Sequence, residues 1–121
     1  MSEELRSSID AAVGSSRVHL FMKGTPEWPQ CGFSKASCDV FRALGVEFTA
    51  TNVLENLDAY RATLGEMTQW PTIPQIFVDG EFIGGCDILI EMYNQGELQK
   101  LLGAESTAAQ GTETTAAQVV Q

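Results

Sequence analysis

The sequence predicts an α/β fold with a four-stranded mixed sheet flanked by helices, and two observations support this prediction. Short apolar segments alternate with segments of helical periodicity, in the order α-β-α-β-α-β-β-α. Near the end of this pattern, two apolar segments are joined by Asp79-Gly80, a dipeptide that favours a tight hairpin. Strands linked by a crossover helix should be parallel, and hairpin strands are antiparallel. The sheet should therefore combine a parallel pair with an antiparallel hairpin.

The first half of the chain contains two helices and a strand with clear boundaries. Apolar residues at helical spacing predict a first helix that Ser2 can cap and Gly14 ends. The near-continuous apolar run 18–22, VHLFM, predicts a strand buried on both faces. A turn with two prolines, KGTPEWPQ, leads into a second helix, expected from about Cys31 to Leu44, and a glycine ends it.

The second half continues the alternation. Its expected elements are a strand over 46–53, a helix over 57–64 ended by Gly65, two strands within 74–85, a helix that Asp87 caps and that runs to 93, and a last turn or two over 97–102. This order, with helices on both faces of the sheet, is the thioredoxin-like architecture. Residues 103–121 show no periodicity, so we expect a domain over 1–102 followed by a disordered polar tail.

Length, composition and charge restrict the function classes. A chain of 121 residues can bury one modest core, and no apolar run approaches the ~20 residues of a membrane span. The net charge of −9 argues against nucleic-acid binding by the surface as a whole. Five of the seven basic residues nevertheless fall within residues 17–61, in the half of the chain that holds Cys31. They are Arg17, Lys23, Lys35, Arg42 and Arg61. This distribution favours a small anionic ligand.

Cys31 is the strongest candidate for a functional residue. It is expected where a strand ends and a helix begins, and there the unpaired N–H groups and the helix dipole stabilise a thiolate. Its polar and glycine neighbours do not suit a core position. Phe33 and then Ser34 stand where a dithiol motif would carry its second cysteine. A second sulfur must therefore come from elsewhere.

The remaining cysteines and the histidine are expected to be mainly structural. Three cysteines without framework spacing fit a reducing compartment. Cys38 lies two helical turns after Cys31, ~10 Å away, whereas a disulfide needs Cα atoms within about 7 Å. Cys86 is either a small contact residue, which we favour, or a second redox thiol. His19 should be a structural residue of its strand, and Met22, Met67 and Met92 should belong to the core.

Two further segments predict a ligand groove beside Cys31. In WPTIPQ, residues 70–75, Pro74 directly precedes a strand, where proline is otherwise unfavourable. In thioredoxin-like folds a cis proline at this place faces the reactive thiol, and the preceding residue, here Ile73, offers its backbone to an extended peptide-like ligand. The alternative is a plain loop with two prolines. In GGCD, residues 84–87, two glycines permit close approach of a ligand and the next helix can bind an anion.

Together these motifs resemble the monothiol glutaredoxins of the CGFS type, in their single-domain form. The matching segments run in family order within residues 5–102: Lys23-Gly-Thr-Pro, Cys31-Gly-Phe-Ser34, Trp70-Pro-Thr-Ile-Pro-Gln75, Gly80-Glu-Phe-Ile-Gly-Gly-Cys-Asp87 and Gly96-Glu-Leu98. Several linked motifs at family-like intervals are far more specific than any one of them. The resemblance implies glutathione as ligand, with Cys31 as the nucleophile.

The resemblance also implies how glutathione would be held. Lys23 and Arg61 would bind its glycine carboxylate, with Phe33 or Gln75 nearby. Ile73 would pair its backbone with the cysteinyl part, and Cys86 with Asp87 would take the γ-glutamyl end. The chain departs from many relatives at Gly65, where they carry a second basic residue. Carboxylate binding should then be weaker or fall wholly to Lys23 and Arg61.

The family is further known for binding a [2Fe–2S] cluster, which usually needs four thiolates. Cys31 supplies one per chain, so two chains and two glutathiones complete the set. The resemblance thus implies a cluster-bridged homodimer that receives a cluster from a scaffold protein and passes it to acceptor proteins. The compartment would be a bacterial cytoplasm, or an organelle matrix such as the mitochondrion if a transit peptide was removed.

Two other functions stay open at this point. In the first, the protein is a thiol-disulfide oxidoreductase: Cys31 attacks a glutathione mixed disulfide and a second glutathione, or Cys86, resolves it. The resemblance implies that this activity is weak or absent. In the second, the protein is a regulatory adaptor whose groove docks partners, for example BolA-like proteins.

Overall fold

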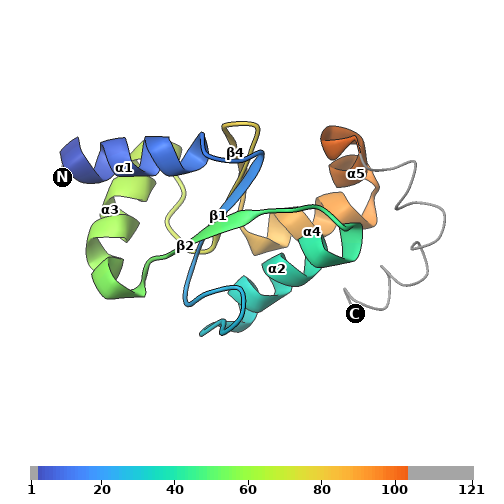
Figure 1. Ribbon diagram of the computed structural model, residues 1–121, viewed down its shortest axis with the longest axis horizontal. Coiled ribbons are helices and arrows are strands. Elements are labelled where there is room, and N and C mark those ends of the chain that lie inside the picture. Colours follow the sequence, from blue (N-terminus) through green and yellow to red (C-terminus); the bar gives the residue numbers. More distant parts are fainter. Residues whose placement is uncertain (1–2, 104–121) are drawn as a thin grey trace.

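The computed structural model describes residues 3–103, which form a four-stranded mixed sheet with helices on both faces (Figure 1). The elements are α1 (Glu3–Val13), β1 (Val18–Met22), α2 (Gly32–Leu44), β2 (Thr49–Asn52), a 3-10 turn (Leu54–Asn56), α3 (Leu57–Thr68), β3 (Gln75–Val78), β4 (Glu81–Gly84), α4 (Cys86–Asn94) and α5 (Glu97–Leu102). The strand order is β2-β1-β3-β4. The predicted thioredoxin-like fold is confirmed.

Strand pairing matches the prediction. β1 pairs parallel with β2 and antiparallel with β3, so that His19 lies opposite both Thr49 and Phe77. β3 and β4 form the antiparallel hairpin. At its turn, Asp79 and Gly80 both have positive φ, 54° and 83°. Two positive φ angles are what a type I′ turn requires, which explains why this dipeptide predicted the hairpin correctly.

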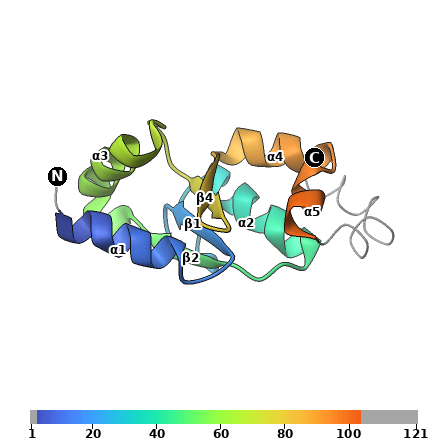
Figure 2. The ribbon, with the colours of Figure 1, turned by 90° about the horizontal axis from the view of Figure 1, so that it is seen from above.

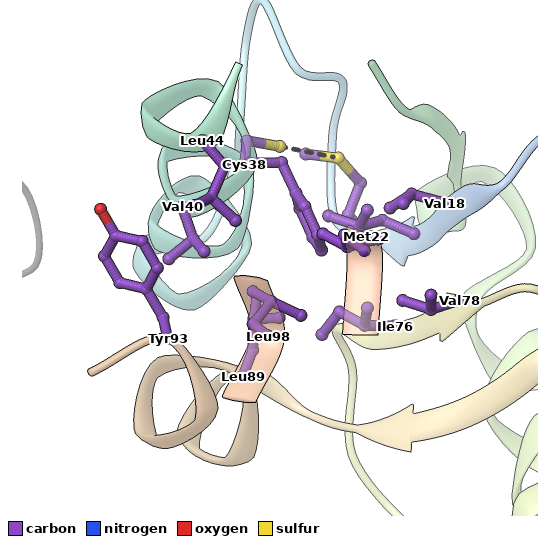
Figure 3. Close-up of a cluster of buried hydrophobic side chains, with 13 residues drawn as sticks. Val18, Met22, Cys38, Val40, Leu44, Ile76, Val78, Leu89, Tyr93 and Leu98 are labelled. Carbon is purple, nitrogen blue, oxygen red and sulfur yellow. Dashed lines mark hydrogen bonds between the residues drawn. The ribbon is translucent and has the colours of Figure 1, made fainter. Parts of the chain in front are cut away.

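The sheet separates two hydrophobic cores. Alternate residues of β1 point to opposite faces. Leu20 and Met22 pack against α2, α4 and α5 in the first core, and Phe21 packs against α1 and α3 in the second core. Figures 1 and 2 accordingly show α1 and α3 at one side of the sheet and the other helices at the opposite side. In the first core, Cys38 lies with its Sγ 3.7 Å from the Met22 sulfur (Figure 3).

The residues expected to be structural are buried or packed against the cores. Cys38 and Met22 are buried, and Met67 and Met92 are partly buried against the second and first core. His19 is buried, and its two ring nitrogens lie 2.6 and 2.8 Å from the hydroxyls of Thr49 and Thr51. Burial lowers the pKa of His19 to about 4. These residues therefore belong to the fold and not to the candidate site.

Three expected boundaries were wrong. β2 begins only at Thr49, three residues after the predicted start. Gly65 does not end α3, which continues to Thr68 and ends at Gln69 in the left-handed region. A helical glycine costs only about 1 kcal/mol relative to alanine, and the extra turn packs Met67 against the second core. Asp87 is not the cap of α4, because Gly85 occupies that position.

The cap and the tail that the sequence predicted at the two ends of the chain lie almost wholly outside residues 3–103. Ser2 and the predicted tail lie outside the described residues, except Gly103, whose left-handed backbone ends α5. The last carbonyls of α5, those of Leu101 and Leu102, accept hydrogen bonds from the Arg17 guanidinium at 3.1 and 2.7 Å.

Within residues 3–103, no helix is both long and apolar enough to cross a membrane.

Candidate functional site

Cys31 stands at the junction that the sequence predicted. It directly precedes α2 as the N-cap residue, with extended backbone angles (φ −154°, ψ 135°), and its carbonyl accepts the Lys35 N–H at 2.9 Å. Its thiol is free and partly exposed. The sulfur therefore lies at the positive end of a 13-residue helix.

The surroundings of Cys31 favour its thiolate. Partial burial raises the pKa of this thiol, but the N–H groups of Ser34 and Phe33, the Ser34 hydroxyl and the Lys23 ammonium lower it, and the net pKa is below the ordinary value. Since the thiolate is both the nucleophile and the metal ligand, Cys31 is suited to either role.

The backbone of the loop between β1 and α2 is held by side chains of α2 and β2. The Lys23 N–H donates to the buried Ser34 hydroxyl at 3.1 Å, and the Gly24 N–H donates to the Asn52 side chain at 3.0 Å. Gly24 has φ 91°, and a Cβ there would lie only 2.5 Å from the Trp28 carbonyl. Only glycine fits this close approach, so the loop holds Cys31 in a fixed place.

A groove of about 390 Å³ opens beside Cys31. It is lined by Lys23, Cys31, Phe33, Arg61, Trp70, Pro71, Thr72, Ile73, Pro74, Gly85, Cys86 and Asp87. All seven site residues that the sequence predicted are thus brought together from four separate segments of the chain. The role of each toward a ligand stays a prediction.

The positive charge at the groove comes from fewer residues than the sequence distribution predicted. Lys23 and Arg61 line the groove. The other three of the five basic residues within 17–61 contact groups outside the groove lining: Arg17 binds Asp79 (3.1 Å), Lys35 binds Asp39 (3.0 Å) and Arg42 donates to the Pro26 carbonyl (3.1 Å). A small anion in the groove would meet two cations.

Residues 70–74 form one wall of the groove, and the Ile73–Pro74 peptide bond is cis, as expected for this architecture. Gln75, by contrast, does not line the groove. It is buried, and its amide nitrogen donates to the carbonyls of Trp70 and Thr72 at 3.0 and 3.2 Å. Gln75 supports the wall from behind, so of Phe33 and Gln75, the two residues expected near the ligand carboxylate, Phe33 lines the groove and Gln75 does not.

The structure adds wall residues that were not singled out as binding residues. Trp70, Pro71 and Thr72 line the groove, and so does Gly85. Their signal was present, because all four belong to the two motifs that predicted the groove. A Cβ on Gly85 would lie 3.0 Å from the indole nitrogen of Trp70, so glycine here lets α4 begin against the wall.

Cys86 differs from Cys31 although it also begins a helix. It is buried at the groove wall, and burial raises its pKa in spite of an opposing effect of the Ser37 hydroxyl. A protonated, buried thiol supports the interpretation of Cys86 as a contact residue. Within residues 3–103 no group of three or more His, Cys, Asp or Glu side chains could hold a metal ion.

The fold and the groove define a thioredoxin-like protein whose one partly exposed thiol, among the described residues, faces a ligand groove. Residues 18–83 match the family described as Glutaredoxin. The chain belongs to the glutaredoxin family, in its monothiol branch, which confirms the resemblance seen in the sequence.

Its relatives come from organelles and bacteria. The chain is 50% identical to "Monothiol glutaredoxin-5, mitochondrial" of Lachancea kluyveri, over 84% of this chain and 73% of the relative. It is 49% identical to "Monothiol glutaredoxin-S7, chloroplastic" of Oryza sativa, over 84% of this chain but only 60% of that longer relative. "Glutaredoxin 4" of Escherichia coli is 46% identical, over 84% and 85%.

Solved structures agree with the fold. Reduced apo GrxS14 from poplar superposes with a TM-score of 0.73 at 45% identity, covering 85% of this chain and 94% of that one. A buckwheat glutaredoxin–glutathione complex gives 0.74 at 27% identity, with the same coverage of 85% and 94%.

Proposed function

We propose that this protein binds a [2Fe–2S] cluster together with glutathione and passes it on, through a homodimer bridged by the cluster. The observation that carries this proposal is the single partly exposed, thiolate-favouring sulfur of Cys31 beside a groove with two cations. A four-thiolate cluster shared by two chains needs two thiolates from the side of each chain, and Cys31 supplies one of them. A small anionic thiol bound in the groove would supply the other half.

Glutathione fits the groove by its chemistry. It is peptide-like, carries carboxylates and a thiol, and is the ligand of the buckwheat glutaredoxin complex. Lys23 and Arg61 would bind its glycine carboxylate beside Phe33. The backbone of Ile73, at the cis proline, would pair with the cysteinyl part. Asp87 and Cys86, at the start of α4, would hold the γ-glutamyl end.

A weakly bound external thiol suits a protein that releases its cargo. Two of the four ligands would be exchangeable, so the cluster would be kept while glutathione is bound and transferred when it leaves. The partners we propose are a scaffold that supplies the cluster and acceptor proteins that receive it, and a BolA-like protein could take the place of one protomer. The organelle and bacterial relatives support a bacterial cytoplasm or an organelle matrix as the location.

The lowered pKa of Cys31 also favours a second function, thiol-disulfide exchange. The Cys31 thiolate would attack the glutathione sulfur of a mixed disulfide and release the substrate as a thiolate. A second glutathione thiolate would then attack the Cys31–glutathione disulfide, releasing oxidised glutathione and restoring Cys31. This reaction needs no dimer, and the same groove would serve it.

The test is anaerobic cluster reconstitution with and without glutathione, read by visible absorption, bound iron and sulfide, and size-exclusion elution. We expect a coloured dimer that bleaches to a monomer when glutathione is removed. Cys31→Ser should lose the cluster, while Cys38→Ala, which removes a cysteine outside the groove, should retain it. A Cys31→Ser protein that holds a full cluster would overturn the proposal. A colourless monomer that reduces glutathione mixed disulfides would favour the oxidoreductase.

A further inference from the structure

The side chain of Gln75 is buried behind the groove wall, and all of its polar atoms have partners there. It is 1% exposed. Its amide nitrogen carries two N–H groups, and these donate to two carbonyls of the wall, those of Trp70 and Thr72. Its amide oxygen lies 3.2 Å from the hydroxyl of Thr68, in the last turn of α3. Gln75 therefore ties the wall to α3 through three interactions.

The backbone of Gln75 belongs to the middle of the sheet. Gln75 is the first residue of β3, it lies opposite Phe21 of β1, and β3 lies between β1 and β4. The wall residues 70–74, by contrast, belong to no helix or strand, so no regular ladder of hydrogen bonds fixes their peptide groups. The contacts of Gln75 hold these peptide groups against a rigid part of the molecule.

One of these hydrogen bonds fixes the direction of the Ile73 N–H. The Thr72–Ile73 peptide bond is trans, so the Thr72 carbonyl and the Ile73 N–H lie in one plane and point in opposite directions. The carbonyl points to Gln75, behind the wall. The N–H therefore points to the other side, toward the groove that Thr72 and Ile73 line. Within residues 3–103 this N–H has no hydrogen-bond partner, so it is available to a ligand.

We infer that Gln75 is a positioning residue for glutathione: by holding the Thr72 carbonyl, it aims the Ile73 N–H at the carbonyl of the cysteinyl part. The inference rests on the proposed function, in which the Ile73 backbone pairs with this part of the ligand. Gln75 itself touches no ligand atom, because it does not line the groove. Without its amide, the Thr72–Ile73 peptide group is free to rotate, and the N–H meets the ligand only part of the time.

The test compares Gln75→Met, Gln75→Glu and His19→Gln with the unmodified, cluster-free chain. Methionine has a similar length but no N–H, and a protonated glutamic acid keeps a single donor. His19→Gln is the matched control, because His19 is also a buried polar residue with two side-chain hydrogen bonds, and it lies outside the groove. NMR titration with reduced glutathione, without oxygen, measures the affinity. Amide hydrogen exchange at Ile73, with and without saturating glutathione, measures whether its N–H is bound, and circular dichroism checks the fold.

We expect Gln75→Met to bind glutathione about three- to tenfold more weakly, the range of one hydrogen bond, and to lose most of the protection that glutathione gives to the Ile73 N–H. Gln75→Glu should lie between Gln75→Met and the unmodified chain, and it decides by the same two measurements if Gln75→Met does not fold. His19→Gln should match the unmodified chain in both.

Unchanged affinity and unchanged protection in the Gln75 variants overturn the inference while the proposed function stands. Weaker binding with the Ile73 N–H still fully protected would give Gln75 a purely structural role, which also overturns it. If the unmodified chain binds no glutathione, the proposed function fails, and the inference fails with it.

Discussion

Two helices of this protein begin at a cysteine, and the two thiols have opposite properties. Cys31 precedes α2, is partly exposed, and has a pKa below the ordinary value. Cys86 is the first residue of α4, is buried, and has a raised pKa. Both lie on the same groove, so their difference comes from their immediate surroundings.

The comparison teaches that a helix N-terminus alone does not produce a reactive thiolate. At Cys31, burial is slight enough for two N–H groups, a hydroxyl and the Lys23 ammonium to outweigh it. At Cys86, burial outweighs the Ser37 hydroxyl, and Asp87 and Cys31 add unfavourable negative charge. Access to solvent and the number of donors aimed at the sulfur therefore decide which thiol does chemistry.

The largest effect should come from removing the exposed thiol. In brief labelling with iodoacetamide at neutral pH, Cys31→Ser should lose nearly all of the rapid reaction, because only a thiolate reacts quickly. Cys86→Ser should keep it. Mass spectrometry of the labelled peptides measures both outcomes. Equal labelling rates at Cys31 and Cys86 in the unmodified chain would show that the contrast between the two thiols is wrong.

His19 extends the comparison to a buried base. Its pKa in the folded chain is about 4, whereas an unfolded histidine titrates near 6.5. Because the unfolded state binds the proton first, the contribution of His19 to stability is complete above pH 6.5 and is lost as the pH falls toward 4. The loss amounts to about 3 kcal/mol.

Urea denaturation between pH 7 and pH 4 measures this effect, with His19→Gln as the reference. The variant should lose less stability on acidification than the unmodified chain. The ring of His19 lies between the hydroxyls of Thr49 and Thr51, and these hydrogen-bonding partners do not titrate in this pH range. Parallel pH profiles for the two proteins would contradict the assignment.

Ser34→Ala removes one of the groups that lower the pKa of Cys31. The buried Ser34 hydroxyl accepts the Lys23 N–H and lowers the pKa of Cys31. Its loss should cost roughly 1–3 kcal/mol of stability, because a buried N–H is left unpaired, and should raise the pKa of Cys31. Ultraviolet thiolate absorbance against pH reads the pKa. Ser37→Ala, one turn further along α2, is the control and should leave Cys31 unchanged.

Lys23→Gln should have the smallest effect. Removing this charge raises the pKa of Cys31 and weakens binding of glutathione by roughly two- to fivefold, since a solvated ion pair contributes up to about 1 kcal/mol. Calorimetry at two salt concentrations measures it, and the difference between variant and unmodified chain should shrink at high salt. Lys35→Gln, whose side chain pairs with Asp39 outside the groove, should bind normally.

Much of this molecule could be predicted because its signals are local. The run 18–22, the Asp79-Gly80 turn and the junction at Cys31 each depend on a few consecutive residues, and each was placed correctly. The seven predicted site residues line one groove because the fold brings together the ends of elements that were themselves predicted.

What could not be predicted depends on packing between distant segments. Gly65 suggested a helix end, but contacts of the following turn with the second core extend α3 past it. Gln75 is polar and adjoins the ligand wall, yet its hydrogen bonds to Trp70 and Thr72 turn it inward. The burial of Cys86, which favours the contact role over the redox role left open for it, likewise depends on packing that its position in the helix does not disclose.

The contact between Arg17 and the last carbonyls of α5 has a practical consequence for handling this protein. Arg17 directly precedes β1, a strand of five residues about 16 Å long, and Cys31 follows the loop at the far end of that strand. The exposed Leu101 therefore lies at the end of the sheet opposite the thiol. Attachment of the chain to a sensor surface through a linker at Leu101 would leave the groove facing the solution.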